Sequence, residues 1–162
     1  MRCRIAIVRH AKSDQSSGAG TDHQRPLNDR GRREAPETAK RLRALGWVPT
    51  VVLCSDAART RETWACMATE LPAPEHIEYL ESLYHAGREA AAAAVALADE
   101  RGATGVVMLV GHNPGWEDMV STLAGDLITM KTAYAALFEA DADSFRAAIG
   151  GRMKLASLVT PS

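Results

Sequence analysis

The stretch Arg4-Ile5-Ala6-Ile7-Val8-Arg9-His10-Ala11-Lys12-Ser13-Asp14 decides the fold of this chain. Its first five residues are mostly apolar and β-branched, which predicts a buried strand over 4–8. Cationic and imidazole side chains follow the strand without any spacer. Open α/β sheets bind their ligands at the carboxyl edge of the strands. The stretch therefore predicts an anion site at that edge, and phosphate is the commonest candidate.

The composition is that of a globular protein of moderate size. A chain of 162 residues fits one domain, 1–162, and is long enough to bury a core. A net charge of -1 argues against nucleic acid or an anionic membrane as partner. The three cysteines show no paired spacing and are expected to be reduced thiols. Without a signal-peptide pattern or an apolar run of ~18 residues, we expect a cytoplasmic location.

Downstream of the first strand, apolar segments alternate between strand and helix periodicity. The pattern predicts further strands at 48–54, 77–80, 105–110, 133–139 and 153–158, and helices at 28–46, 57–70, 88–101 and 116–123. Asn28 or Asp29 is expected to cap the first helix, and Ser55 or Asp56 the second. Gly150-Gly151 are expected to close a hairpin. The alternation predicts an α/β fold, a three-layer α/β/α sandwich with a mostly parallel central sheet.

Three of these strands end in polar groups of matching chemistry. The first ends at Arg9 and His10, the second leads to Arg59, and the central strand, 105–110, ends at His112. If the strands are parallel, the four side chains converge at one edge of the sheet. Arginine forks bind phosphoryl oxygens, one imidazole can attack phosphorus, and a second, if protonated, can donate to the transition state. The sequence has no acidic cluster and no P-loop, so we expect neither a metal nor a nucleotide cofactor.

These residues also carry a resemblance to a known family. The run Arg9-His10-Ala11 resembles the Arg-His-Gly signature of the histidine phosphatase superfamily. Ser55-Asp56-Ala57-Ala58-Arg59, with Thr63 four residues on, resembles its Ser-Pro-x-x-Arg-x-x-x-Thr element, and Gly111-His112 resembles its second histidine. The chain departs from the signatures at Ala11 and Asp56, which replace a glycine and a proline. Its shortness and the run from Arg9 to Ser13 resemble the small phosphohistidine phosphatase (SixA-type) branch.

The resemblance implies a phosphoglycerate mutase-like fold and a phosphatase that works without metal or cofactor. It implies His10 as the nucleophile, with Arg9, Arg59 and His112 binding the phosphoryl group. Arg25, in Arg25-Pro26-Leu27, is a candidate for a further phosphate contact.

Two further residues have open roles. In the mutase and sugar-phosphatase branches a glutamate after the third strand protonates the leaving oxygen, and Glu81 lies in about that place; the alternative is a solvated loop carboxylate. Asn113 is either a pocket residue or a turn residue ahead of Pro114. The remaining histidines, His23, His76 and His85, are expected on surface loops.

Two classes of function fit these observations. The first is a phosphatase that acts on a phosphorylated protein, for example a phosphohistidine domain, or on a small phosphate ester. The second is a module that binds phosphorylated partners without turnover. Retention of both histidines favours the enzyme, because a binding module needs no imidazole nucleophile.

Overall fold

A mixed β-sheet forms the centre of the molecule. The computed structural model describes residues 1–15 and 20–162, and within them it places a six-stranded sheet of order β3-β2-β4-β1-β5-β6. The strands are β1 (Arg2–Arg9), β2 (Pro49–Ser55), β3 (His76–Leu80), β4 (Val106–Gly111), β5 (Ala135–Asp141) and β6 (Lys154–Val159). The first four run parallel, whereas β5 and β6 are antiparallel to their neighbours. The prediction of a mostly parallel sheet is confirmed.

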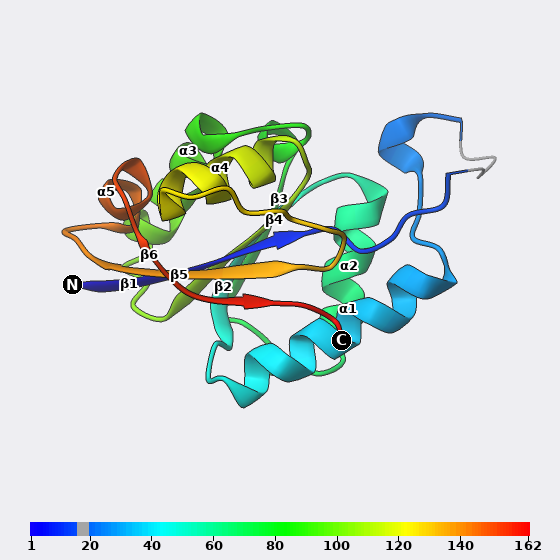
Figure 1. The fold of residues 1–162 in the computed structure, drawn as a ribbon, viewed down its shortest axis with the longest axis horizontal. Helices are drawn as coiled ribbons and strands as arrows, with labels where there is room; N and C mark the ends of the chain where they lie inside the picture. Colours follow the sequence, from blue (N-terminus) through cyan, green and yellow to red (C-terminus); the bar gives the residue numbers. More distant parts are fainter. Residues whose placement is uncertain (16–19) are drawn as a thin grey trace.

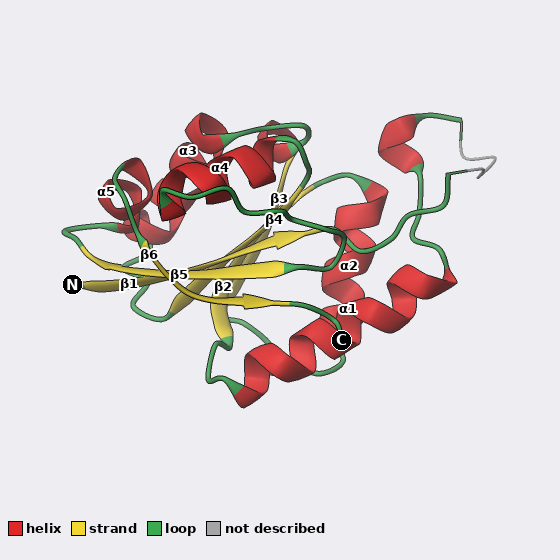
Figure 2. Cartoon of the chain, in the orientation of Figure 1, coloured by secondary structure: helices red, strands yellow, loops and turns green. Residues whose placement is uncertain are grey.

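Helices cover both faces of the sheet (Figure 1). One face carries α3 (Arg88–Glu100), α4 (Gly115–Ala124) and α5 (Phe145–Gly150), and the other carries α1 (Asp29–Ala44) and α2 (Ala58–Ala68). Two short 3-10 helices, η1 (Asp22–Gln24) and η2 (Glu81–Leu83), lie in the loops after β1 and β3. Figure 2 shows the strands in yellow between the two groups of red helices. The three-layer sandwich is therefore as expected.

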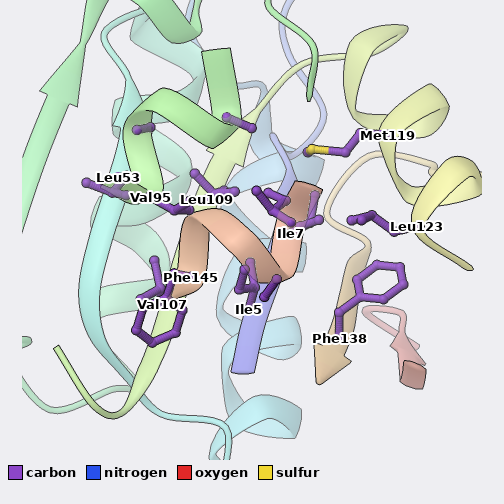
Figure 3. Packing of buried hydrophobic residues seen from close by; sticks show 14 of the residues in the cluster. Ile5, Ile7, Leu53, Val95, Val107, Leu109, Met119, Leu123, Phe138 and Phe145 are labelled. Carbon is purple, nitrogen blue, oxygen red and sulfur yellow. The ribbon is translucent and has the colours of Figure 1, made fainter. Parts of the chain in front are cut away.

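The central strands β1, β2 and β4 are nearly continuous apolar runs because both of their faces are buried, whereas the edge strands β3 and β6 are partly exposed. Along β1, Ile5 and Ile7 pack with Leu109 beneath α3, α4 and α5 (Figure 3). The alternate residues Ala6 and Val8 pack with the cluster beneath α1 and α2. The alternation follows from the pleat, which sends successive side chains to opposite faces. These two cores fix the ends of the parallel strands relative to one another.

One cap was predicted correctly and one was not. Asn28 begins α1 as expected, since its side-chain oxygen accepts a hydrogen bond from Gly31 N at 2.9 Å. Neither Ser55 nor Asp56 caps α2; its N-cap is Ala57, which makes no side-chain capping bond. Ser55 is instead the last residue of β2, and its hydroxyl contacts the ring of His112.

The predicted hairpin at Gly150-Gly151 is wrong. The six-residue helix α5 separates β5 from β6, although the two strands do pair antiparallel. Ser144 begins the helix, because its hydroxyl accepts a hydrogen bond from Ala147 N at 3.0 Å. The helix buries Phe145 and Ile149 against the sheet. A helix of fewer than two turns is too short to display a 3.6-residue period in the sequence.

Among the described residues, no helix combines the length and the apolar character that a membrane crossing requires.

Candidate active site

A polar cavity of about 270 Å³ opens at the carboxyl ends of the parallel strands. Side chains predicted for the site line it together: Arg9, His10, Arg25, Arg59, His112 and Asn113. The pairing of Arg9 with Gly111 across β1 and β4 brings the two histidine-bearing strand ends side by side. The expected convergence of four groups at one sheet edge is what the structure contains.

His10 is a buried, neutral imidazole. Its Nδ1 lies 2.7 Å from the carbonyl oxygen of Ala11, which can only accept, so Nδ1 carries the proton and donates. Nε2 then keeps its lone pair. Burial, together with the nearby cations Arg59 and Arg9, lowers the pKa of His10 to about 3 against the opposing effect of the backbone hydrogen bond. At neutral pH the ring is therefore a free base whose unprotonated nitrogen is Nε2.

Thr63 holds the loop that carries this histidine. Its Oγ1 accepts a hydrogen bond from Ala11 N at 2.9 Å and donates one to the carbonyl oxygen of Arg59 at 2.6 Å. Both bonds are buried. Thr63 thereby ties the residue after His10 to the first turn of α2, from which Arg59 extends.

The second histidine is oriented by the end of β2. His112 Nε2 lies 2.8 Å from the hydroxyl oxygen of Ser55, and the His112 ring centroid lies 5.4 Å from that of His10. Its Nδ1 is buried without a hydrogen-bond partner. Burial, together with the neighbouring His10 and Arg59, lowers the pKa of His112 to about 2. An anion beside this ring would reverse that balance, because opposite charge favours the protonated imidazole.

Each of the two arginines has a donor that meets no acceptor among the described residues. Arg9 donates from Nη1 to the carbonyl oxygen of Met130 at 3.0 Å, and Arg59 donates from Nη1 to the carbonyl oxygen of Asp22 at 2.9 Å. The Nε atoms of both arginines are buried without partners. Buried donors normally have an acceptor. An oxyanion in the cavity would supply one, so these residues fit a phosphoryl group.

The two remaining predicted contacts also lie in the cavity wall. Arg25 donates to the hydroxyl of Ser13 and, from Nη2, to the Asp22 carboxylate at 2.9 Å. Asn113 donates from Nδ2 to the Met130 carbonyl oxygen at 2.8 Å. Asn113 is therefore fixed to the same carbonyl as Arg9.

Glu81 is not among the cavity residues. It is exposed, at the start of η2, while the turn after it brings Tyr84 and His85 back toward the strand ends. The structure therefore gives no geometric support to a general-acid role for this carboxylate.

Sequence reasoning missed Asp22, Tyr84 and His85 around the cavity, and it also missed the lining residues Gln15 and Thr132. His85 lies on an exposed loop, as expected, and it also lines the cavity, with Nε2 3.3 Å from the Asp22 carboxylate. Tyr84 donates its hydroxyl to the same carboxylate. No sequence pattern marks these residues, since their positions depend on how two loops fold back.

The other histidines lie outside this cavity. His23 Nε2 is 2.8 Å from Asp56, and His76, the first residue of β3, is 3.0 Å from Glu78. Across the described ranges 1–15 and 20–162, no group of three or more histidine, cysteine, aspartate or glutamate side chains is placed to hold a metal ion.

Fold and site together define an α/β protein with a polar cavity at the ends of its parallel strands, lined by arginines and histidines. Comparison with known proteins gives the family: residues 5–84 match the model of the histidine phosphatase superfamily (branch 1). An uncharacterized chloroplastic protein of Arabidopsis thaliana is 34% identical, over 98% of this chain and 78% of its own length. The chain belongs to the histidine phosphatase superfamily and is a phosphatase of the hydrolase class.

Solved structures show the same fold. The protein histidine phosphatase SixA complexed with tungstate superposes with a TM-score of 0.81 at 20% identity, covering 98% of this chain and 97% of that one. A proposed phosphohistidine phosphatase SixA from Nakamurella multipartitia gives a TM-score of 0.81 at 26% identity, covering 99% and 97%. The phosphoglycerate mutase-like fold expected from the sequence is thereby confirmed.

Proposed function

We propose that this chain is a phosphohistidine phosphatase that acts on a phosphorylated protein through a covalent intermediate on His10. The observation that carries the proposal is the tautomer and charge of His10. Its Nδ1 donates to Ala11 O, and its pKa is lowered to about 3, so Nε2 is an unprotonated nucleophile at neutral pH. The likeness of the fold to SixA proteins supports the same assignment.

The reaction has two displacements at phosphorus. In the first, His10 Nε2 forms a bond to phosphorus while the bond from phosphorus to the substrate nitrogen breaks, and the leaving nitrogen keeps the electron pair and takes a proton from solvent. In the second, water attacks the phosphoryl group on His10, and the electron pair of the phosphorus–Nε2 bond returns to the ring. The products are inorganic phosphate and the unmodified histidines.

The cationic residues stabilise charge that develops on the phosphoryl oxygens. Arg9 and Arg59 supply the buried Nε donors, for which the described part of the chain offers no acceptor. His112 adds Nδ1, held in orientation by Ser55 at Nε2. Arg25 and Asn113 line the cavity as further contacts. Donors fixed in a site shielded from water stabilise such charge without reorganising during the reaction.

The position of Glu81 favours phosphohistidine over a small phosphate ester. An alkoxide is a poor leaving group and needs a general acid, whereas a protonated imidazole leaves phosphorus readily. Glu81 is exposed and outside the cavity, so a substrate that needs no protein acid suits the site better. A metabolite phosphatase and a binding module are the competing outcomes of the assay.

The test is a turnover assay with a phosphohistidine-bearing phosphotransfer protein beside a panel of phosphate esters, in the presence of EDTA. We expect preference for the protein substrate and loss of at least about a thousandfold in His10→Ala. His76→Ala is the matched control, because His76 begins β3 and does not line the cavity. Preference for an ester would instead indicate a metabolite phosphatase. Oxyanion binding without turnover of any substrate would indicate a binding module.

A further inference from the structure

One carboxylate gathers the polar side chains at the mouth of the cavity. Asp22 accepts hydrogen bonds from Arg25 at one oxygen and from Arg59, Tyr84 and His85 at the other. These four partners come from three separate segments: the loop after β1, helix α2 and the loop after β3. In Figure 1, η1, which begins at Asp22, is the short blue helix near α2.

We infer that Asp22 is a positioning residue, which holds the outer edge of the Arg59 guanidinium so that its inner edge is presented to the phosphoryl group. The inference rests on the proposed function and adds a residue that the known motifs do not contain. It places Asp22 behind the arginine rather than in contact with the substrate.

The bonding of Arg59 supports two separate edges. Nη1 donates to the backbone carbonyl oxygen of Asp22 at 2.9 Å, and Nη2 lies 3.1 Å from the Asp22 carboxylate. Nε remains buried without a partner. A planar guanidinium has its five N–H groups fixed in one fork, so anchoring two nitrogens fixes the direction of the third.

Asp22 does not substitute for the substrate anion. A carboxylate that occupied the phosphoryl position would accept from the buried donors there. Within residues 1–15 and 20–162 those donors have no partner while Asp22 is in place: Nε of Arg9, Nε of Arg59 and Nδ1 of His112. The carboxylate and the phosphoryl group therefore occupy different positions around Arg59.

The charge of Asp22 also lets Arg25 and Arg59 lie close together. Two guanidinium groups facing one cavity repel each other, and a shared carboxylate offsets that repulsion. The hydrogen bonds from Tyr84 and Arg25 hold the pKa of Asp22 well below its usual range. Asp22 is therefore ionised throughout the pH range of an assay.

The direction in which anion affinity changes when Asp22 loses its charge distinguishes a positioning role from a purely electrostatic one. Coulomb attraction alone predicts that removing a negative charge from the cavity tightens anion binding. The Asp22 side chain is 48% exposed, so solvent screens its charge, whereas the Arg59 side chain is only 3% exposed and its orientation depends on its bonds. We therefore expect Asp22→Asn to weaken anion binding.

The experiment is calorimetric titration with tungstate, which requires no turnover. Asp22→Asn is expected to weaken tungstate binding about tenfold, and the loss should shrink to less than about threefold in an Arg59→Lys background. In an Arg9→Lys background the loss should persist in full, because Arg9 makes no bond to Asp22. Asp29→Asn, which removes a carboxylate 90% exposed on α1, is the matched control and should bind as wild type does.

Two results of the tungstate titration would contradict the inference. Tighter binding by Asp22→Asn would mean that the carboxylate competes with the anion, and an equal loss in the Arg59→Lys background would mean that Asp22 acts independently of Arg59. Either result overturns the inference. If Asp22→Asn fails to fold, Tyr84→Phe, which removes one of the donors to Asp22, should give a smaller loss that also depends on Arg59. Wild-type protein that binds tungstate but hydrolyses nothing would refute the proposed function. The comparison of tungstate binding among the Asp22 and Arg59 variants would still test the inference about Asp22.

Discussion

Arg59 links several parts of the site through its contacts with Asp22 and Thr63. It is almost fully buried, it is anchored by Asp22, and its backbone carbonyl accepts from Thr63. We expect Arg59→Ala to lower kcat by roughly 100- to 1,000-fold, about 3 kcal/mol, by analogy with the loss of an oxyanion-hole donor. Arg61→Ala is the control, since Arg61 is exposed on the same helix and stacks on Tyr79. Unchanged kcat/KM in Arg59→Ala would remove this arginine from the site.

Substitution of Glu81 tests whether the leaving group needs a protein general acid. Because this carboxylate is exposed and outside the cavity, Glu81→Gln should leave turnover of a phosphohistidine protein within about twofold of wild type. The measurement is steady-state kcat/KM with that substrate, beside p-nitrophenyl phosphate. A loss of tenfold or more with the protein substrate would show that the loop after β3 moves Glu81 to the leaving group.

Residues at strand ends could be predicted from the sequence, and residues in folded-back loops could not. His10 and His112 follow buried apolar runs directly, so their place at the sheet edge follows from the strand pattern alone. Asp22 and His85 reach the same cavity through loops, and the path of a loop depends on tertiary contacts. Glu81 is the opposite case, because its position after the third strand suggested a general acid, whereas its side chain lies outside the cavity.

At the scale of elements, the start of α4 packs directly against the loop that carries His85. A Cβ at Gly115 would lie 1.9 Å from the carbonyl oxygen of Ala86, which is backbone and cannot rotate away. We expect Gly115→Ala to destabilise the fold by about 1–3 kcal/mol in urea unfolding, as overpacking does. Gly150→Ala is the matched control, because a Cβ there meets nothing within 4 Å, and it should be neutral or slightly stabilising. Equal effects of the two substitutions would contradict the close contact.

Periodicity predicted the longer elements and failed at the shortest. Helices α1 and α3 bury alanines at helical spacing, together with Leu42 in α1 and Val95 in α3, and the sequence displays this spacing over several turns. Helix α5 has only six residues, and its N-cap Ser144 stands in a cluster of turn-forming residues. The N-cap of α2 was misplaced because Ser55 is a good capping residue whose hydroxyl is used for His112 instead.

At the scale of the whole molecule, the buried histidines couple stability to pH. The pKa values of His10, about 3, and His112, about 2, lie below the ordinary value of 6.5. Between those values and 6.5 the unfolded chain binds more protons than the folded one. The free energy of unfolding therefore rises with pH in this window and falls on acidification below 6.5.

Urea unfolding measured from about pH 4.5 to 7.5 checks this dependence. Wild-type stability should fall steadily towards the acid end, and a His10→Asn, His112→Asn double variant should show a shallower slope because it lacks both protonation sites. Parallel slopes for the two proteins would assign the acid sensitivity to other groups.

The presence of a hydrophobic core on each face of the sheet limits where the sequence of this protein can vary. Strands β1, β2 and β4 each contribute to both hydrophobic clusters, so a substitution in them disturbs two packed layers at once. The loops that surround the cavity belong largely to neither cluster. Variation that alters which phosphorylated partner is accepted is therefore expected to collect in the loops after β1 and β3, while the strands stay nearly invariant. A library that randomises the cavity mouth outside the phosphoryl-binding residues would yield folded proteins at a far higher rate than one that randomises the strands.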